Sequence, residues 1–226
     1  MLYGFISSRY NKLIGILLVL LFLFPDSSSS QQLDNQKILI MGDSLIQGFG
    51  LAQKDGFVNQ LERHLIDQGM NIQLVNGGVS GDTTAGGLAR LEWSLTDDIG
   101  GVMISLGAND MLRGLPPGNA KKNLAQIVQK LKERGLPVLL VGIKSIANYG
   151  SKYKLEFDQI FEDLSNEYDL ILYPDLLAPI IEQKSEKLED YLQADKLHPN
   201  ADGVLLIVNG VVPFVIELIE LTKFKH

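Results

Sequence analysis

The sequence contains no cysteine. It therefore has no disulfide bond, no thiolate metal site, no cysteine nucleophile and no cysteine that could carry a lipid anchor. Basic residues are also few, since 20 Lys and Arg stand against 27 Asp and Glu, for a net charge of -7. Because neutralising nucleic-acid phosphates requires a basic face, we expect no nucleic-acid partner.

One long apolar run stands near the start of the sequence. Basic residues precede a continuous apolar run at 13–24, and Pro25 and Asp26 separate that run from a group of serines. This order is typical of a secretory signal peptide, which we place at residues 1–30. The run is shorter than the roughly 20 residues of a membrane span. Because serines replace the usual cleavage pattern, an uncleaved inner-membrane anchor is the alternative. We expect an exported protein, periplasmic in a Gram-negative bacterium.

The rest of the sequence alternates short apolar runs with amphipathic segments. This rhythm predicts an α/β domain, and a single core suits residues 37–226. The apolar runs are typical of parallel strands buried on both faces. We expect strands at 37–41, 72–76, 102–106, 137–143 and 170–172. We expect helices at 57–68, around 124–131, at 151–168 and at 201–223, the last with a kink at Pro213.

Polar motifs follow three of these strands and precede the last helix. Ser44 follows the first expected strand, Gly81 the second and Asn109 the third. Asp195 and His198 come just before the final helix. Because the carboxyl ends of parallel strands meet at one edge of a sheet, we expect these residues to converge there.

A serine, a histidine and an aspartate among them suit nucleophilic catalysis. A serine hydroxyl needs a base within hydrogen-bond reach and a third group that orients the base. Asp195 can accept from one ring nitrogen of His198 and leave the other for Ser44. Taken alone, Ser44 with the aspartate before it is equally typical of a turn cap, and Asp195 is equally typical of an ordinary turn. His64 and His226 are expected to be solvated.

Three groups are suited to stabilise an oxyanion. The backbone N–H groups of Ser44 and Gly81 and the side-chain amide of Asn109 are donors of the kind that a tetrahedral intermediate requires. Each has a plain alternative: Gly81 in a turn before a helix capped by Asp82 or Thr83, and Asn109 as a turn residue after a strand. Their joint occurrence favours the catalytic interpretation.

In this order the motifs resemble the conserved blocks of the GDSL or SGNH hydrolases, which carry a nucleophilic serine, an oxyanion glycine, an oxyanion asparagine and a D-x-x-H pair. The sequence lacks the G-x-S-x-G elbow that α/β-hydrolases place on a central strand. Further similarity, to the bacterial TesA-like group of acyl-CoA thioesterases, lysophospholipases and arylesterases, lies at 40–45, 75–76, 79–83, 87–91, 112–114, 147–150 and 198–200.

The resemblance implies a flavodoxin-like, three-layer α/β/α fold with a five-stranded parallel sheet in the order 2-1-3-4-5. It implies that Ser44 is the nucleophile of a triad with Asp195 and His198. Gly81 and Asn109 then complete the oxyanion hole with the Ser44 N–H.

The same resemblance implies hydrolysis of acyl esters and thioesters, including lysophospholipids and small aryl esters, through an acyl-enzyme. In such relatives a mobile loop after the asparagine lines the acyl site, and here it corresponds to 110–117. Packing of this loop onto the domain is the alternative role for its apolar side chains. We expect substrate contacts from Asp110, Met111, Leu112, Arg113, Gly114 and Leu115. We expect an opposite wall from Leu177, Pro179, Ile180 and Tyr191.

Ala108 is a departure from the resemblance. Close relatives usually carry glycine at this position, so the alanine could shift the loop backbone near Asn109.

Two other functions stay open at this point. A carbohydrate or cell-wall O-deacetylase of the same family would lose activity on acyl groups longer than acetyl. A non-catalytic flavodoxin-like binding module would hold an anionic ligand at a helix N-terminus, but it would have no use for Asp195 and His198.

No cofactor is expected, because the serine mechanism requires none. Asp43, Asp82 and Asp110 together could hold a hard cation. Each stands in a glycine-bearing turn where aspartate commonly bonds local N–H groups, so we expect no metal. The expected partner is a small-molecule or lipid acyl substrate, with transient contact with a membrane surface left open, and we expect a monomer.

Overall fold

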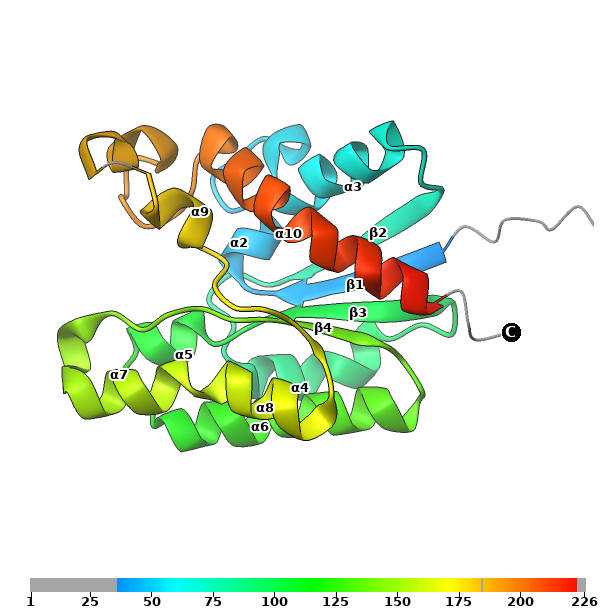
Figure 1. The fold of residues 1–226 in the computed structure, drawn as a ribbon, viewed down its shortest axis with the longest axis horizontal. Helices are drawn as coiled ribbons and strands as arrows, with labels where there is room; N and C mark the ends of the chain where they lie inside the picture. Colours follow the sequence, from blue (N-terminus) through cyan, green and yellow to red (C-terminus); the bar gives the residue numbers. More distant parts are fainter. Residues whose placement is uncertain (1–35, 184, 223–226) are drawn as a thin grey trace, which may run out of the picture. The chain divides into compact units, whose positions relative to one another are not determined.

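A five-stranded parallel sheet lies at the centre of the computed structural model, which describes residues 36–183 and 185–222 (Figure 1). The strand order is β2-β1-β3-β4-β5, and each neighbouring pair is parallel. This confirms the expected fold class and strand order. The segment at 1–30, expected to be a signal peptide or anchor, lies outside the described residues. The strands are β1 (Gln36–Gly42), β2 (Ile72–Gly78), β3 (Ile99–Ser105), β4 (Val138–Val141) and β5 (Ile171–Tyr173).

Helices cover both faces of the sheet (Figure 1). One face carries α3 (Phe57–Asp67), α9 (Ala178–Ile181) and α10 (Ala201–Thr222). The other carries α4 (Thr84–Ser94), α6 (Pro117–Glu133), α7 (Gly150–Asp158) and α8 (Ile160–Tyr168). Short helices follow the strands at α2 (Ser44–Gln47) and α5 (Ala108–Leu112), and 3-10 turns lie at η2 (Gln53–Asp55), η3 (Ala147–Tyr149) and η4 (Ser185–Tyr191).

Strand β1, which lies between β2 and β3, shows why helices cover both faces of the sheet. Its side chains alternate between faces, so Ile38 and Ile40 join the core under α3 and α10, whereas Leu39 and Met41 join the core under α4, α6 and α8. All four are at most 1% exposed. A strand buried on both faces reads as a continuous apolar run, which is the pattern seen in the sequence.

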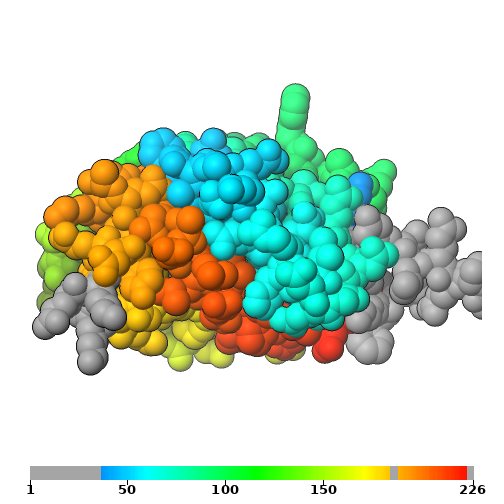
Figure 2. Space-filling model, turned by 90° about the horizontal axis from the view of Figure 1, so that it is seen from above, coloured from blue at the N-terminus to red at the C-terminus, as the bar shows by residue number. Residues whose placement is uncertain are grey.

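Helix α10 is long and apolar enough to cross a membrane by length and composition. In this fold its apolar side chains have another use, because Val204, Ile207, Val211 and Val215 are buried in the core. Figure 2 shows this face, where α10 (orange to red) lies beside α3 (cyan). The helix continues through Pro213 to Thr222. We therefore describe α10 as a core helix.

Two expectations about helices are corrected. The helix expected at 151–168 is two helices, α7 and α8, that meet at Gln159. Gln159 keeps a right-handed helical backbone, so the apolar periodicity continues across the break. The loop expected at 110–117 begins inside α5, which is too short for periodicity to reveal.

Candidate active site

The polar motifs meet at the carboxyl edge of the sheet, as the topology predicts. Ser44 is the first residue of α2, directly after β1, and Asn109 lies in α5 after β3. Gly81 lies in the loop between β2 and α4, and His198 lies just before α10. All four line one cavity of about 370 Å³.

Ser44, His198 and Asp195 form a continuous series of hydrogen bonds. The Nε2 atom of His198 lies 2.9 Å from Ser44 Oγ, and its Nδ1 atom lies 2.7 Å from Asp195 Oδ2. A carboxylate can only accept, so Nδ1 carries the ring proton and Nε2 is left to accept from the serine hydroxyl. The set has the geometry of a general base paired with a nucleophile.

The local backbone fixes Asp195. Its Oδ1 atom accepts from the backbone N–H groups of Leu197 at 2.9 Å and His198 at 3.0 Å. Lys196 adopts a left-handed conformation with φ 56°, which closes this tight turn. Hydrogen bonds from the backbone and side chain of His198, and from Leu197, lower the pKa of Asp195 to about 2. The carboxylate is therefore ionised at neutral pH and holds the imidazole in one orientation.

Gln193 connects the segment around His198 to the segment that follows Ser44 and α2. Its Nε2 atom donates to the carbonyl oxygens of Phe49 at 2.8 Å and Pro199 at 2.9 Å, and its backbone N–H donates to His198 O at 2.8 Å. The Phe49 ring rests on the His198 ring, with centroids 4.8 Å apart. Gly50 makes room, because a Cβ there would lie 2.2 Å from Gln193 Oε1. Sequence reasoning missed Gln193, since nothing in a lone glutamine signals this role.

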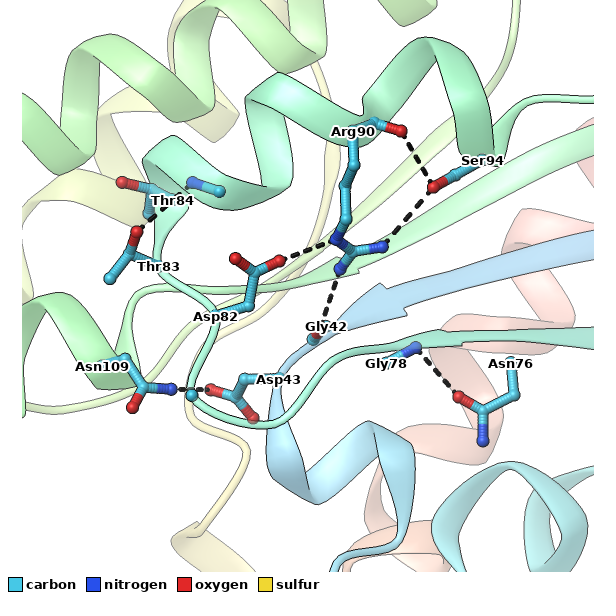
Figure 3. A network of polar contacts seen from close by, with 12 residues as sticks. Gly42, Asp43, Asn76, Gly78, Asp82, Thr83, Thr84, Arg90, Ser94 and Asn109 are labelled. Carbon is cyan, nitrogen blue, oxygen red and sulfur yellow. Dashed lines mark hydrogen bonds and ion pairs between the residues drawn. The ribbon is translucent and has the colours of Figure 1, made fainter.

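The candidate oxyanion donors face the same cavity. Gly81 has φ 77°, a left-handed conformation that favours glycine. Its carbonyl oxygen accepts from Arg113 Nη2 at 2.7 Å, which fixes the orientation of the loop. The side-chain amide of Asn109 points toward Asp43, with Nδ2 3.4 Å from Asp43 Oδ2 (Figure 3). The expected alternative role of Thr83 is also present, since its side chain caps α4 at Gly86 N.

Ala108 and the glycine before it stand where β3 leads into α5. The unusual backbone angle falls on Gly107, with φ 124°, while Ala108 is the first residue of α5 and lines the cavity.

Asp43 is the buried carboxyl of the site. It is 6% exposed, and its Oδ1 atom accepts from Leu45 N at 3.2 Å, capping α2. Burial is the main cause that raises the pKa of Asp43 to about 6, against the lowering effect of the Leu45 N–H. The cap expected from the sequence is thus present beside Ser44, the candidate nucleophile.

The other two carboxylates considered as cation ligands are bonded within the protein. Asp82 pairs with Arg90 Nε at 2.7 Å, and Arg90 Nη2 donates to Gly42 O at 3.0 Å, which ties the loop after β2 to the end of β1 (Figure 3). Asp110 is buried and accepts from Thr84 N at 2.8 Å and Thr84 Oγ1 at 2.7 Å. Among the described residues, no group of three or more His, Cys, Asp or Glu is arranged to hold a metal ion.

The cavity extends from Ser44 over the carboxyl ends of β3, β4 and β5. Of the residues expected to contact substrate, Met111, Leu112 and Leu177 line it. Arg113, Gly114 and Leu115 are not among its lining residues; in the same loop, Tyr153 Oη donates to Leu115 O at 2.9 Å. Also outside its lining are Asp110, Pro179, Ile180 and Tyr191. Apolar lining residues that sequence reasoning missed are Leu45, Leu106, Val141, Ile143, Ile146, Leu176, Ile181 and Leu197.

The remaining histidines lie elsewhere. His64 is on α3 and is half-buried, and it does not line the cavity. His226 lies outside the described residues.

Comparison with known proteins places the chain in a family. Residues 40–205 match the model of the GDSL-like lipase/acylhydrolase family. The chain belongs to this family. It is 37% identical to "Esterase TesA" of Pseudomonas aeruginosa over 81% of this chain and 90% of that protein. It is 32% identical to "Arylesterase" of Vibrio mimicus, over 93% of this chain and 98% of that one.

Two further comparisons agree with this GDSL membership. The chain is 33% identical to "Thioesterase 1/protease 1/lysophospholipase L1" of Escherichia coli strain K12, over 74% of this chain and 76% of that protein. A crystal structure of TesA superimposes with a TM-score of 0.74 at 35% identity, covering 81% of this chain and 99% of that one. The family is one of ester and thioester hydrolases, so the chain is an enzyme of that class.

Proposed function

We propose that the protein hydrolyses acyl esters and thioesters with Ser44 as its nucleophile. The observation that carries the proposal is the series of hydrogen bonds from Asp195 through His198 to Ser44 at the mouth of an apolar cavity. The names of the GDSL relatives, an esterase, an arylesterase and a thioesterase/lysophospholipase, support the same reaction class.

Each proposed step assigns a role to one of the groups described above. His198 Nε2 takes the proton of Ser44 Oγ as the oxygen attacks the acyl carbon. The oxyanion that forms is stabilised by the N–H groups of Ser44 and Gly81 and by the amide of Asn109. His198 then donates its proton to the leaving oxygen or sulfur as the bond to the acyl carbon breaks. Water, activated by the same nitrogen, hydrolyses the acyl-enzyme.

The apolar cavity fits the acyl part of such a substrate. Buried Val141 and Leu176 and half-buried Ile143 and Leu177 offer aliphatic surface beside the nucleophile. Burying a methylene group there contributes about 0.8 kcal/mol. We therefore expect activity to rise with acyl length until the cavity is filled.

The test is hydrolysis of p-nitrophenyl esters from acetyl to palmitoyl and of matching acyl thioesters, beside a Ser44→Ala variant. The proposal predicts a maximum at medium or long acyl lengths and no activity in the variant. Activity on acetyl alone would favour the O-deacetylase alternative. A folded protein without activity on any ester or thioester would refute the hydrolase proposal.

We also propose that the enzyme is an exported monomer that touches lipid surfaces transiently. The signal-like segment at 1–30 supports export. An exposed apolar rim around the cavity supports lipid contact, and its members are 38–59% exposed: Phe49, Leu112, Ile146, Ile181 and Leu197. Cell fractionation tests the export, and co-sedimentation with phospholipid vesicles tests the contact.

A further inference from the structure

A second cavity, of about 510 Å³, lies on the other side of the nucleophile. Its walls come from α2, the turn that follows it, α3 and β2. β1 lies between β2 and β3 in the sheet. The acyl cavity extends over β3, β4 and β5, so the two cavities lie on opposite sides of Ser44, which follows β1. We call the second one the amide cavity, because four amide side chains line it: Gln47, Gln53, Asn59 and Asn76.

The two cavities adjoin at two places. Phe49 lines both of them, and its ring rests on His198. Ser80 lines the acyl cavity and donates its hydroxyl to Gln47 Oε1, and Gln47 lines the amide cavity. A group that leaves the acyl carbon beside His198 is therefore next to the amide cavity.

The polar atoms of the amide cavity are only partly engaged. Asn76 Oδ1 accepts from Gly78 N at 2.9 Å (Figure 3), and Glu62 Oε1 accepts from Leu74 N at 2.7 Å. The NH₂ groups of Gln47 and Asn76 donate to no residue in the described part of the chain, and the Asn59 side chain has no hydrogen bond there. Donors and acceptors thus remain for a ligand.

The charges of the residues that line the amide cavity indicate which class of ligand it can bind. Among the described residues that line the amide cavity, none is Lys or Arg, and Glu62 is an acid. A phosphate or carboxylate would meet repulsion and no cation. A neutral group with several hydroxyls suits the lining, because each hydroxyl both donates and accepts. The half-exposed Phe49 ring adds an apolar face for the carbon backbone of such a group.

We propose that the amide cavity binds the alcohol part of the substrate, and that this alcohol is polyhydroxylated, as in a glycerol or sugar ester. The inference rests on the proposed hydrolase function. In the acylation step the bond between the acyl carbon and the alcohol oxygen breaks, the acyl carbon stays on Ser44 Oγ, and His198 Nε2 donates its proton to the departing oxygen. The hydroxyls of the alcohol then hydrogen-bond Gln47, Asn59 and Asn76.

The test compares two esters of one acid, glyceryl monobutyrate and propyl butyrate, which differ by two hydroxyls. We expect wild-type kcat/KM to be higher for the glyceryl ester. Asn59→Leu and Asn59→Ala should lower kcat/KM for that ester about three- to tenfold more than for the propyl ester, the size of one hydrogen bond. Asn59 suits the test because its side chain makes no hydrogen bond to another described residue.

The matched control is Asn166→Leu, an exposed asparagine on α8 that lines neither cavity. It should leave the ratio between the two esters unchanged. Equal wild-type kcat/KM for both esters, or an equal loss on both in the Asn59 variants, would overturn the inference. Hydrolysis of p-nitrophenyl butyrate by the wild type separates the two proposals, because its absence would refute the hydrolase function itself.

Discussion

Replacing Asp43 with asparagine should stabilise the protein at neutral pH. The pKa of Asp43 is raised from 3.8 to about 6, chiefly by burial. One pKa unit corresponds to about 1.4 kcal/mol, so the ionised carboxylate costs the folded state about 3 kcal/mol. Below about pH 4 the carboxyl is protonated in both folded and unfolded states, and the cost is absent. It grows as pH rises through the interval between the two pKa values and is complete above about pH 6.

An asparagine at this position would be nearly the same size, could still cap Leu45 N, and would not ionise. We expect the free energy of unfolding of Asp43→Asn to exceed that of the wild type by up to about 3 kcal/mol at pH 7.5. For a protein of this size that corresponds to about 6–12 °C in melting temperature. The gain should fall to less than about 1 kcal/mol at pH 4. The assay is thermal or urea unfolding of both proteins at pH 4, 5.5 and 7.5.

A variant less stable than the wild type at pH 7.5, or a gain that is the same at pH 4, would refute the reasoning.

The Asp43→Asn variant should also be a poorer enzyme. Asp43 accepts from Leu45 N through Oδ1 and from the Asn109 amide through Oδ2. An asparagine at position 43 has one side-chain oxygen, so that oxygen would accept from only one of these two donors. A stabilising change that lowers kcat is the trade-off expected where a buried charge serves a site.

Four further substitutions test the site. Asp195→Asn should lower kcat by about 10³- to 10⁴-fold without unfolding the protein, because the ring of His198 would take the wrong tautomer; kcat within tenfold of the wild type would contradict this. Asn109→Ala should lower kcat by about 10²- to 10³-fold with little change in KM, as for removal of one oxyanion donor, and a change confined to KM would speak against that role. Gln193→Met should lower kcat and leave the acyl-length preference unchanged. Ile143→Phe should instead lower kcat/KM for long acyl groups and spare butyryl. Kinetics of both variants on the series of p-nitrophenyl esters test these expectations, and the reversed pattern would contradict them.

The order of the motifs along the sequence was enough to predict where the candidate catalytic residues meet. Ser44, Gly81 and Asn109 each follow a strand of a parallel sheet, and topology alone brings such positions to one edge. The strands were predictable because residues such as Ile38 and Leu39 are buried on opposite faces and give continuous apolar runs.

Features that depend on distant contacts were not predictable. Gln193 reaches Phe49, which lies 144 positions away in the sequence, so no local pattern announces that bond. The bonds of Arg113 Nη2 to Gly81 O and of Tyr153 Oη to Leu115 O likewise join residues more than 30 positions apart. The amide cavity likewise forms only when α2, α3 and β2 pack together.

The most direct test of the account is covalent labelling with a fluorophosphonate, followed by intact mass and peptide mapping. The account predicts one phosphonyl group per molecule, on the peptide that contains Ser44, and loss of ester hydrolysis in step with labelling. The Ser44→Ala variant should remain unlabelled. Activity that persists after full labelling, or a label on another serine with Ser44 unmodified, would contradict the assignment of Ser44 as the nucleophile.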